Sequence, residues 1–267
     1  MAYERAVKTR CIVLCGGSNR RWKGYKDIPT KHFADLGGEV LLHRTLSQLA
    51  QYDSLEVHLV IKREDKKYFD FFPPSHLYHI TLDENIHTEA YKYLSSKGLW
   101  NREGRTVVLL GDVWFSDRAM KRIIGDKKRR WSVFGRSVKS FITGCPYREL
   151  FAQSFWPEHH KKHYDKLQEL DEIYRTTASI QASGWAHYRM MNGIPHDVHA
   201  ICLRNFVEVS DFTDDIDSPE DYERWNKLYR EWYTLGTFTK VSLAVKQKCK
   251  QIRQYPRYYW RRIRNKR

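Results

Sequence analysis

The residues best suited to chemistry lie near the start of the chain, where an apolar run over residues 11–15 is followed by Gly16 and Gly17. Because glycine lacks a Cβ, backbone N–H groups in such a loop can approach an anion closely. Arg21 adds a guanidinium that can contact phosphate through two hydrogen bonds, and Lys31 adds a compact positive charge. This combination predicts a loop that grips the phosphates of a nucleotide.

Two acidic positions could hold the metal ion that such phosphates commonly carry. Asp112 directly follows the continuous apolar run 106–110, which is typical of a central parallel strand covered on both faces. Ligands of open parallel sheets bind beyond the carboxyl ends of the strands, so Asp112 is well placed for Mg²⁺ or Mn²⁺. The alternative for Asp112 is a turn or a helix cap. Asp217 lies on a loop that could return to the same place and complete a site for phosphoryl or nucleotidyl transfer.

The elements that must position these residues alternate between strand-length apolar runs and segments of helical period. Strands are expected near residues 10–15, 55–61, 77–81, 106–110, 131–134 and 207–209. Helices are expected near residues 41–51, 86–95, 116–124 and 159–173, and after the N-cap Ser218. This rhythm predicts a doubly wound, mainly parallel sheet in a three-layer α/β/α sandwich. Residues 1–236 would form this catalytic domain, and residues 237–267 an extension.

The composition favours a cytoplasmic protein. Apolar residues make up 41% of the chain, but no apolar stretch approaches the length of a membrane span. Residues 1–5 lack the apolar core of a signal peptide. The five cysteines are scattered and odd in number, which suits reduced thiols.

The net charge of +15 is concentrated in the extension, because eleven basic and no acidic residues follow from Lys240 to the end. Val241, Val245, Cys249 and Ile252 recur there at helical spacing, and aromatic residues then alternate with cations. Such a segment could dock on the enzyme or on a partner chain. It could also bind an anionic membrane surface, which would make the location membrane-peripheral, or nucleic acid. We favour docking first, the membrane surface second and nucleic acid third.

Three segments resemble, in this order, the sugar nucleotidyltransferase family of NDP-sugar pyrophosphorylases and cytidylyltransferases. They are residues 14–22 with 31–33, residues 111–113, and residues 215–222. The resemblance spans about residues 10–230 and implies a Rossmann-like nucleotidyltransferase fold. It further implies transfer of NMP from an NTP to a sugar phosphate or related phosphorylated alcohol, with release of pyrophosphate.

The resemblance also implies roles for individual residues. Arg21 would bind the β- and γ-phosphates, and Lys31 would neutralise charge on the α-phosphate as pyrophosphate leaves. Asp112 and Asp217 would be the Mg²⁺ pair, with Asp112 counted among the catalytic residues. A further group would contact the base and phosphates of the nucleotide: Gly16, Gly17, Ser18, Asn19 and Thr88.

The chain departs from the family pattern in its phosphate loop, and two other function classes stay open. Asn19 stands where a third glycine is common, and Thr30 separates Pro29 from Lys31. One alternative is a nucleotide-sugar-dependent glycosyltransferase of related fold, which would use an Asp-x-Asp metal site. The segment 112–114 lacks the second acid of that motif. The other alternative is a nucleic-acid-binding protein that acts through its basic tail.

The acceptor pocket is expected within the less regular region 136–200. Arginines suit phosphates and aromatic faces suit sugars, and the candidates of these types are Arg136, Arg148, Trp185, His187, Arg189 and His196. Residues 158–163 have zinc-like histidine spacing, but the adjacent lysines indicate a solvated helix face instead.

Overall fold

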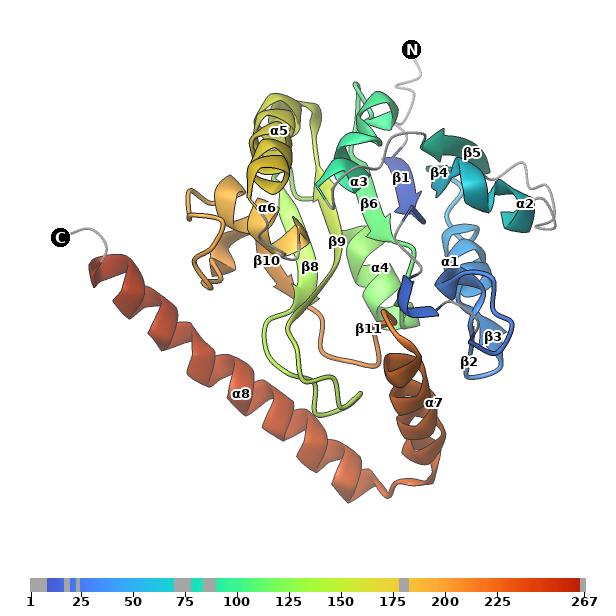
Figure 1. The fold of residues 1–267 in the computed structure, drawn as a ribbon. Helices are drawn as coiled ribbons and strands as arrows, with labels where there is room; N and C mark the ends of the chain where they lie inside the picture. Colours follow the sequence, from blue (N-terminus) through green and yellow to red (C-terminus); the bar gives the residue numbers. More distant parts are fainter. Residues whose placement is uncertain are drawn as a thin grey trace, which may run out of the picture.

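The computed structural model describes residues 9–16, 20–22, 25–69, 78–83, 90–177 and 183–264. Within these residues, the central sheet has seven strands in the order β10-β8-β9-β6-β1-β4-β5 (Figure 1). Its strands are β1 (Thr9–Leu14), β4 (Leu55–Lys62), β5 (Tyr78–Asp83), β6 (Thr106–Leu110), β8 (Ser132–Arg136), β9 (Glu149–Phe155) and β10 (Phe206–Glu208).

The sheet is mainly parallel, as the sequence predicts. β1 pairs in parallel with β4 and β6, β4 pairs in parallel with β5, and β8 pairs in parallel with β10. β9 was not expected, and it runs antiparallel between β6 and β8. Residues 150–155 are all buried although Gln153 and Ser154 are polar. The segment therefore shows neither a continuous apolar run nor an alternating pattern that would predict a strand.

Helices cover both faces of the sheet and complete the three layers. They are α1 (Leu41–Leu49), α2 (Lys66–Phe69) and α4 (Asp117–Gly125) on one face, and α3 (Tyr91–Leu94), α5 (His160–Thr176) and α6 (Ser183–Met191) on the other. Successive side chains of a strand point to opposite faces. Cys11 and Val13 accordingly pack in the first apolar layer, and Ile12 and Leu14 in the second. The expected helix near residues 86–95 is described only from residue 90 onward.

Short elements connect these layers. Two-stranded ladders join β2 (Asp35–Leu36) to β3 (Glu39–Val40), and β7 (Val113–Trp114) to β11 (Asp214–Asp215). Single 3₁₀ turns cover Arg20–Trp22, Lys31–Phe33, Arg63–Asp65, Lys97–Leu99, Pro157–His159 and Leu203–Asn205. The β7–β11 ladder joins segments about a hundred residues apart at the end of β6.

Helix α7 (Pro219–Thr234) begins where the sequence predicts. The Ser218 hydroxyl accepts a hydrogen bond from the backbone N–H of Asp221 at 3.2 Å, which caps the first turn. The helix is held by the fully buried Trp225, whose ring lies 4.6 Å from that of Trp114 and 4.5 Å from that of Tyr229. This aromatic cluster fixes the loop that precedes α7 against β7.

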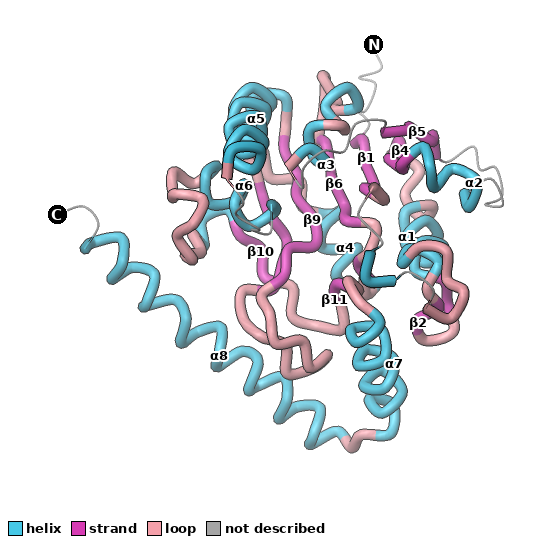
Figure 2. The backbone as a smooth tube through the Cα atoms, viewed as in Figure 1, coloured by secondary structure: helices cyan, strands magenta, loops and turns pink. Residues whose placement is uncertain are grey.

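Helix α8 (Thr237–Arg264) is one continuous helix and makes up the described part of the expected C-terminal extension. It runs along one edge of the molecule (Figures 1 and 2) and contacts the sheet at β10, where Gln251 donates to Glu208. Among the described helices, α8 included, none has an apolar stretch long enough to cross a membrane.

The expectation that residues 158–163 form a solvated face is wrong for His163. Its side chain is fully buried, with its ring centre 4.2 Å from that of Phe155 and 4.8 Å from that of His187. His163 lies on the inner side of α5, whereas Lys161 is exposed. Because residues 158–163 are all polar, their sequence does not indicate which of these side chains the helix buries.

Candidate active site

Gly16 and Asp112 follow the ends of β1 and β6 at the same edge of the sheet, because these two strands are adjacent and parallel. The backbone N–H of Gly111 donates to the carbonyl oxygen of Leu14 at 2.9 Å. A Cβ on Gly111 would lie 2.6 Å from the sulfur of Cys15 and 2.9 Å from that carbonyl oxygen. Glycine at position 111 therefore permits the close approach that sets Asp112 beside the end of β1.

The second acidic segment reaches this edge through the β7–β11 ladder. Asp215 pairs with Val113, and the backbone N–H of Ile216 donates to the carbonyl oxygen of Asp112 at 2.9 Å. The side chain of Ile216 is fully buried in the aromatic cluster. Since neighbouring residues of an extended chain point to opposite sides, Asp215 and Asp217 both turn toward Asp112.

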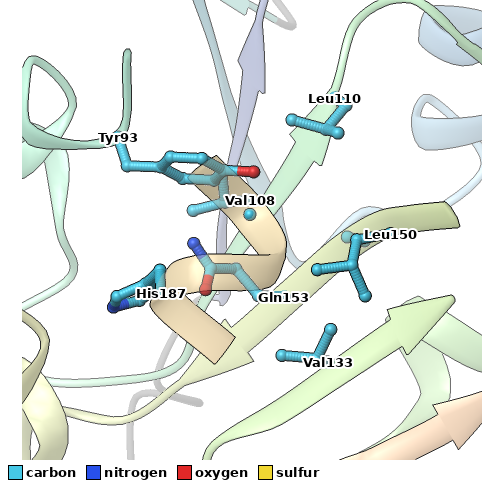
Figure 3. A pocket seen from close by; sticks show the side chains of 9 residues that line it. Tyr93, Val108, Leu110, Val133, Leu150, Gln153 and His187 are labelled. Carbon is cyan, nitrogen blue, oxygen red and sulfur yellow. The ribbon is translucent and has the colours of Figure 1, made fainter. Parts of the chain in front are cut away.

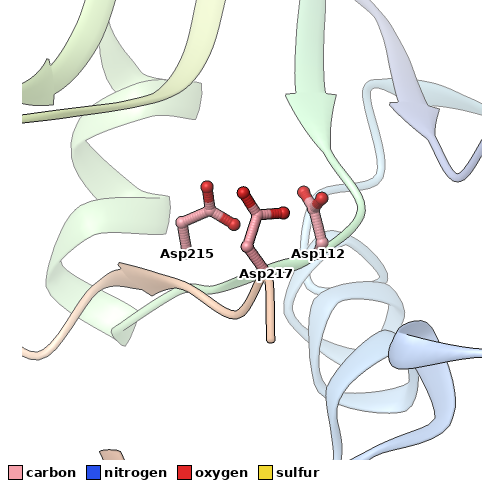
Figure 4. A group of neighbouring side chains, drawn as sticks. All are labelled: Asp112, Asp215 and Asp217. Atoms are coloured by element: carbon pink, nitrogen blue, oxygen red, sulfur yellow. The ribbon is translucent and has the colours of Figure 1, made fainter. Parts of the chain in front are cut away.

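Three carboxylates consequently meet in one group (Figure 4). Asp112, Asp215 and Asp217 each offer an oxygen, and these oxygens lie within 4.8 Å of one another. All three side chains are half-buried. Figure 4 shows the three carboxylates turned toward one region beyond the end of β6.

Lys31 lies against this group. Its ammonium donates to Oδ1 of Asp217 at 2.6 Å and also pairs with Oδ2 of Asp112, and its side chain is only 5% exposed. Burial by itself lowers the pKa of a lysine, but the neighbouring Asp112 and Asp217 outweigh it and raise the pKa of Lys31. Lys31 is therefore a fixed positive charge at neutral pH.

Arg21 contacts the same group from the solvent side. Its Nη2 lies 3.3 Å from Oδ2 of Asp217, while its side chain is 64% exposed. A guanidinium in this position can hold the carboxylate and still turn toward an arriving anion. The structure thus brings together the side chains of Arg21, Lys31, Asp112 and Asp217, and their roles stay predictions.

The electrostatics of the acidic group suit a divalent cation. Burial opposes ionisation of Asp112, yet Lys31 lowers the pKa of this carboxyl to about 2. Burial together with Asp217 and Asp112 raises the pKa of Asp215 well above its usual range. Oδ1 of Asp215 is buried and has no hydrogen-bond partner among the described residues. Such a surplus of negative oxygen donors fits a hard cation such as Mg²⁺.

The remaining predicted nucleotide contacts are described only in part. Gly16 lies at the end of β1 and is buried. Gly17, Ser18, Asn19 and Thr88 lie outside the described residues, and their roles stay predictions. Asp215 was not predicted. The pattern Asp215-Ile216-Asp217, with an apolar residue between two acids in an extended segment, is the signal that could have indicated it.

Arg136, considered above as an acceptor contact, belongs instead to a buried ion pair. Its side chain is 1% exposed, and Nη2 donates to Oδ1 of the fully buried Asp214 at 2.7 Å. Glu149 lies nearby, and burial together with Asp214 and Asp217 outweighs Arg136 and raises the pKa of Glu149 to about 8. Because Asp214 precedes Asp215 in β11, this ion pair lies next to the acidic cluster in the chain.

The other acceptor candidates mostly make contacts within the fold. The indole N–H of Trp185 donates to the carbonyl oxygen of Arg148 at 3.1 Å, and Nη1 of Arg189 donates to that of His196 at 2.6 Å. His187 lines a small pocket between α3, α6 and the sheet (Figure 3). The pocket is lined by Tyr93, Val108, Leu110, Val133, Leu150, Ala152, Gln153, Gly184 and His187. Leu110 places it beside the strand end that carries Asp112.

Comparison with solved structures identifies the fold. A candidate glucose-1-phosphate thymidylyltransferase from Bacillus anthracis aligns with a TM-score of 0.60 and 16% identity, over 83% of this chain and 95% of that one. A UDP-glucose pyrophosphorylase aligns with a TM-score of 0.57 and 12% identity, over 84% and 99% of the two chains. The CTP:phosphocholine cytidylyltransferase of Streptococcus pneumoniae aligns with a TM-score of 0.54 and 13% identity, over 84% of this chain and 100% of that one. No protein-family model and no curated protein matches the sequence. The chain has the nucleotidyltransferase fold.

Proposed function

We propose that this chain is a nucleotidyltransferase, which transfers NMP from an NTP to a sugar phosphate or related phosphorylated alcohol and releases pyrophosphate. The observation that carries the proposal is the meeting of Lys31, Asp112 and Asp217 beyond the ends of β1 and β6. The similar structures support it because their names describe transfer of a nucleotide to phosphorylated sugars or to phosphocholine.

The proposed metal is Mg²⁺, which Mn²⁺ could replace. Asp112, Asp215 and Asp217 would hold it through carboxylate oxygens, which are the ligands that Mg²⁺ prefers. When bound, the ion neutralises negative charge on the phosphates of the nucleotide. The unpaired Oδ1 of Asp215 supports a role as a third ligand beside the two aspartates that the sequence indicates.

The cationic residues would bind and align the triphosphate. Gly16 opens the loop in which Gly17, with Ser18 and Asn19, would offer backbone groups to phosphate. Arg21 would contact the β- and γ-phosphates from its exposed position. The ammonium of Lys31 would face the α-phosphate, where negative charge develops as pyrophosphate leaves.

The reaction needs no covalent enzyme intermediate. A phosphate oxygen of the acceptor attacks the α-phosphorus in line, a new P–O bond forms, and the bond between the α-phosphorus and the bridging oxygen of pyrophosphate breaks. The rate enhancement would come from alignment of the two substrates and from the fixed charge of Lys31. The NTP substrate and the five unpaired cysteines support a cytoplasmic location.

A pyrophosphate-release screen tests the proposal. Each of the four NTPs is incubated with Mg²⁺, the protein and a panel of sugar phosphates, polyol phosphates and phosphocholine. We expect release with one NTP and one acceptor class. A related glycosyltransferase would instead release a nucleotide from a nucleotide sugar. Absence of pyrophosphate from every pair, with such a release from a nucleotide sugar, would overturn the proposal.

A further inference from the structure

We propose that α8 binds the protein to an anionic membrane surface and lies in the plane of that surface. Four large apolar side chains of this helix face solvent. Phe238 is 88% exposed, Val241 55%, Val245 54% and Ile252 53%. With the exposed Cys249 they recur every three or four residues, so they form one apolar stripe along the helix.

The opposite face of α8 holds the helix to the protein. The backbone N–H of Phe141 donates to Oε1 of Gln247 at 2.8 Å, and Nε2 of Gln251 donates to Oε1 of Glu208 at 2.9 Å. Both glutamine side chains are buried. In the described part of α8, these polar residues contact the body of the protein, whereas the apolar stripe faces solvent.

Positive charge flanks the apolar stripe. Helix α8 contains no acidic residue, and four cations beside the stripe are exposed: Lys246, Lys248, Lys250 and Arg253. Lys248 also lines a pocket where α8 meets α4 and β10. This pocket has five cationic side chains, Lys121, Arg122, Lys128, Arg130 and Lys248, against two acidic ones, Asp126 and Glu208. The cationic surface therefore continues from the helix onto the body of the protein.

An anionic lipid surface matches both the apolar stripe and the cations beside it, whereas nucleic acid or a second copy of the chain matches only one of the two. Interfacial helices insert an apolar stripe at the headgroup boundary while flanking Lys and Arg contact anionic lipids. Nucleic acid would pair with the cations but leave the stripe in water. A second copy of α8 would cover the stripe but bring two rows of like charge together. The sequence after residue 254 adds Tyr and Trp among arginines, residue types enriched at membrane interfaces.

The test measures sedimentation of the full chain with lipid vesicles. The vesicles contain phosphatidylcholine alone or phosphatidylcholine mixed with phosphatidylglycerol. We expect binding only to the mixed vesicles, and weaker binding at high salt. The double variant Val241→Glu/Val245→Glu should bind at least about tenfold more weakly, because two carboxylates would enter the interface. The matched control is Ser47→Glu/Ala50→Glu, which makes the same charge change at an exposed position of α1 and at its exposed C-cap, and should bind like the wild type.

A second variant separates charge from apolar contact. Replacing Lys246, Lys248 and Lys250 by glutamine keeps the stripe and should also weaken binding to the mixed vesicles. Circular dichroism of each variant should match that of the wild type. Transfer activity on soluble substrates should be unchanged throughout, so the inference can fail without affecting the proposed reaction.

The inference would be overturned if the protein did not bind the mixed vesicles. It would also be overturned if the α8 and α1 double variants weakened vesicle binding equally. A dimer in light scattering that Val241→Glu/Val245→Glu dissociates would assign the stripe to a second copy. Displacement of the protein from vesicles by duplex DNA or RNA, with the same variant losing nucleic-acid binding, would assign it to nucleic acid.

Discussion

The ammonium of Lys31 and the carboxylate of Asp217, 186 positions apart in the chain, are joined by a 2.6 Å hydrogen bond at the ends of β1 and β6. Asp112 shares the same ammonium, so one lysine binds two carboxylates that come from different parts of the sequence. This contact links the 3₁₀ turn Lys31–Phe33 to the acidic segment before α7.

Lys31→Met should abolish most turnover while the protein remains folded. It removes the positive charge proposed to face the α-phosphate, and loss of one preorganised group of this kind costs about 10²–10³-fold in kcat. Steady-state pyrophosphate release measures the effect. The matched control is Lys161→Met, which removes a lysine whose side chain is 88% exposed on α5. Equal activity of the two variants would remove Lys31 from the mechanism.

Asp112→Asn should leave the fold intact and sharply reduce Mg²⁺-dependent turnover, because it removes one negative ligand. Asp215→Asn should raise the Mg²⁺ concentration needed for half-maximal activity, since Asp215 is the proposed third ligand. Turnover measured against Mg²⁺ concentration distinguishes the two effects. Asp165→Asn, at an exposed position of α5, is the control. Unchanged metal dependence in Asp215→Asn would exclude Asp215 from the site.

Mg²⁺ or Mn²⁺ should raise the melting temperature in the absence of nucleotide. A ligand that binds only the folded state stabilises it by mass action, about 2.7 kcal/mol at a hundredfold excess over Kd. Asp112, Asp215 and Asp217 should provide this effect. Differential scanning fluorimetry with and without EDTA measures it. The double variant Asp112→Asn/Asp217→Asn should show no shift, and a shift of wild-type size in that variant would place the metal elsewhere.

The protein should lose stability as the pH falls below about 6.5, the usual pKa of histidine. Burial lowers the pKa of His187 to about 3, and burial beside His187 lowers the pKa of His163 well below its usual value. Below pH 6.5 the unfolded chain therefore binds protons that the folded chain does not. Stability is fully present above that pH and decreases toward about pH 3, by about 2 kcal/mol per histidine at pH 5.

Urea unfolding at pH 7.5 and pH 5 measures this loss. His163→Phe should reduce the difference between the two pH values, because phenylalanine does not titrate and fits beside Phe155 and Trp131. His43→Phe, at an exposed position of α1, should leave the difference as in the wild type. If His163→Phe did not reduce the pH dependence, the loss of stability at low pH could not be assigned to the buried His163.

Arg136→Met should destabilise the fold by about 3–5 kcal/mol, because it leaves the fully buried carboxylate of Asp214 without its main partner. The double variant Arg136→Met/Asp214→Leu removes both charges and should recover part of this loss. Denaturant unfolding of the three proteins gives the coupling energy of the pair. Additive effects of the two substitutions would show that the pair is not coupled.

Local sequence patterns predicted the main parallel elements well. The apolar run 106–110 gave β6, and the capping residues Ser218 and Pro219 placed the start of α7. Strand β9 was missed, because its burial depends on neighbours from other parts of the chain. Gln153 and Ser154 are polar and become buried only when β6 and β8 flank this strand. Such context does not appear in a single segment.

The sequence by itself determined the chemistry available: glycines and cations after β1, an aspartate after β6, and an acidic segment before α7. Tertiary structure decided how these meet. The β7–β11 ladder and buried Ile216 turn Asp215 and Asp217 toward Asp112, which no local pattern specifies because the segments lie about a hundred residues apart. Likewise, the sequence defined the apolar stripe of α8, but only the packed structure shows that Gln247 and Gln251 face the protein. Periodicity identifies the faces of a helix, whereas burial depends on what lies opposite each one.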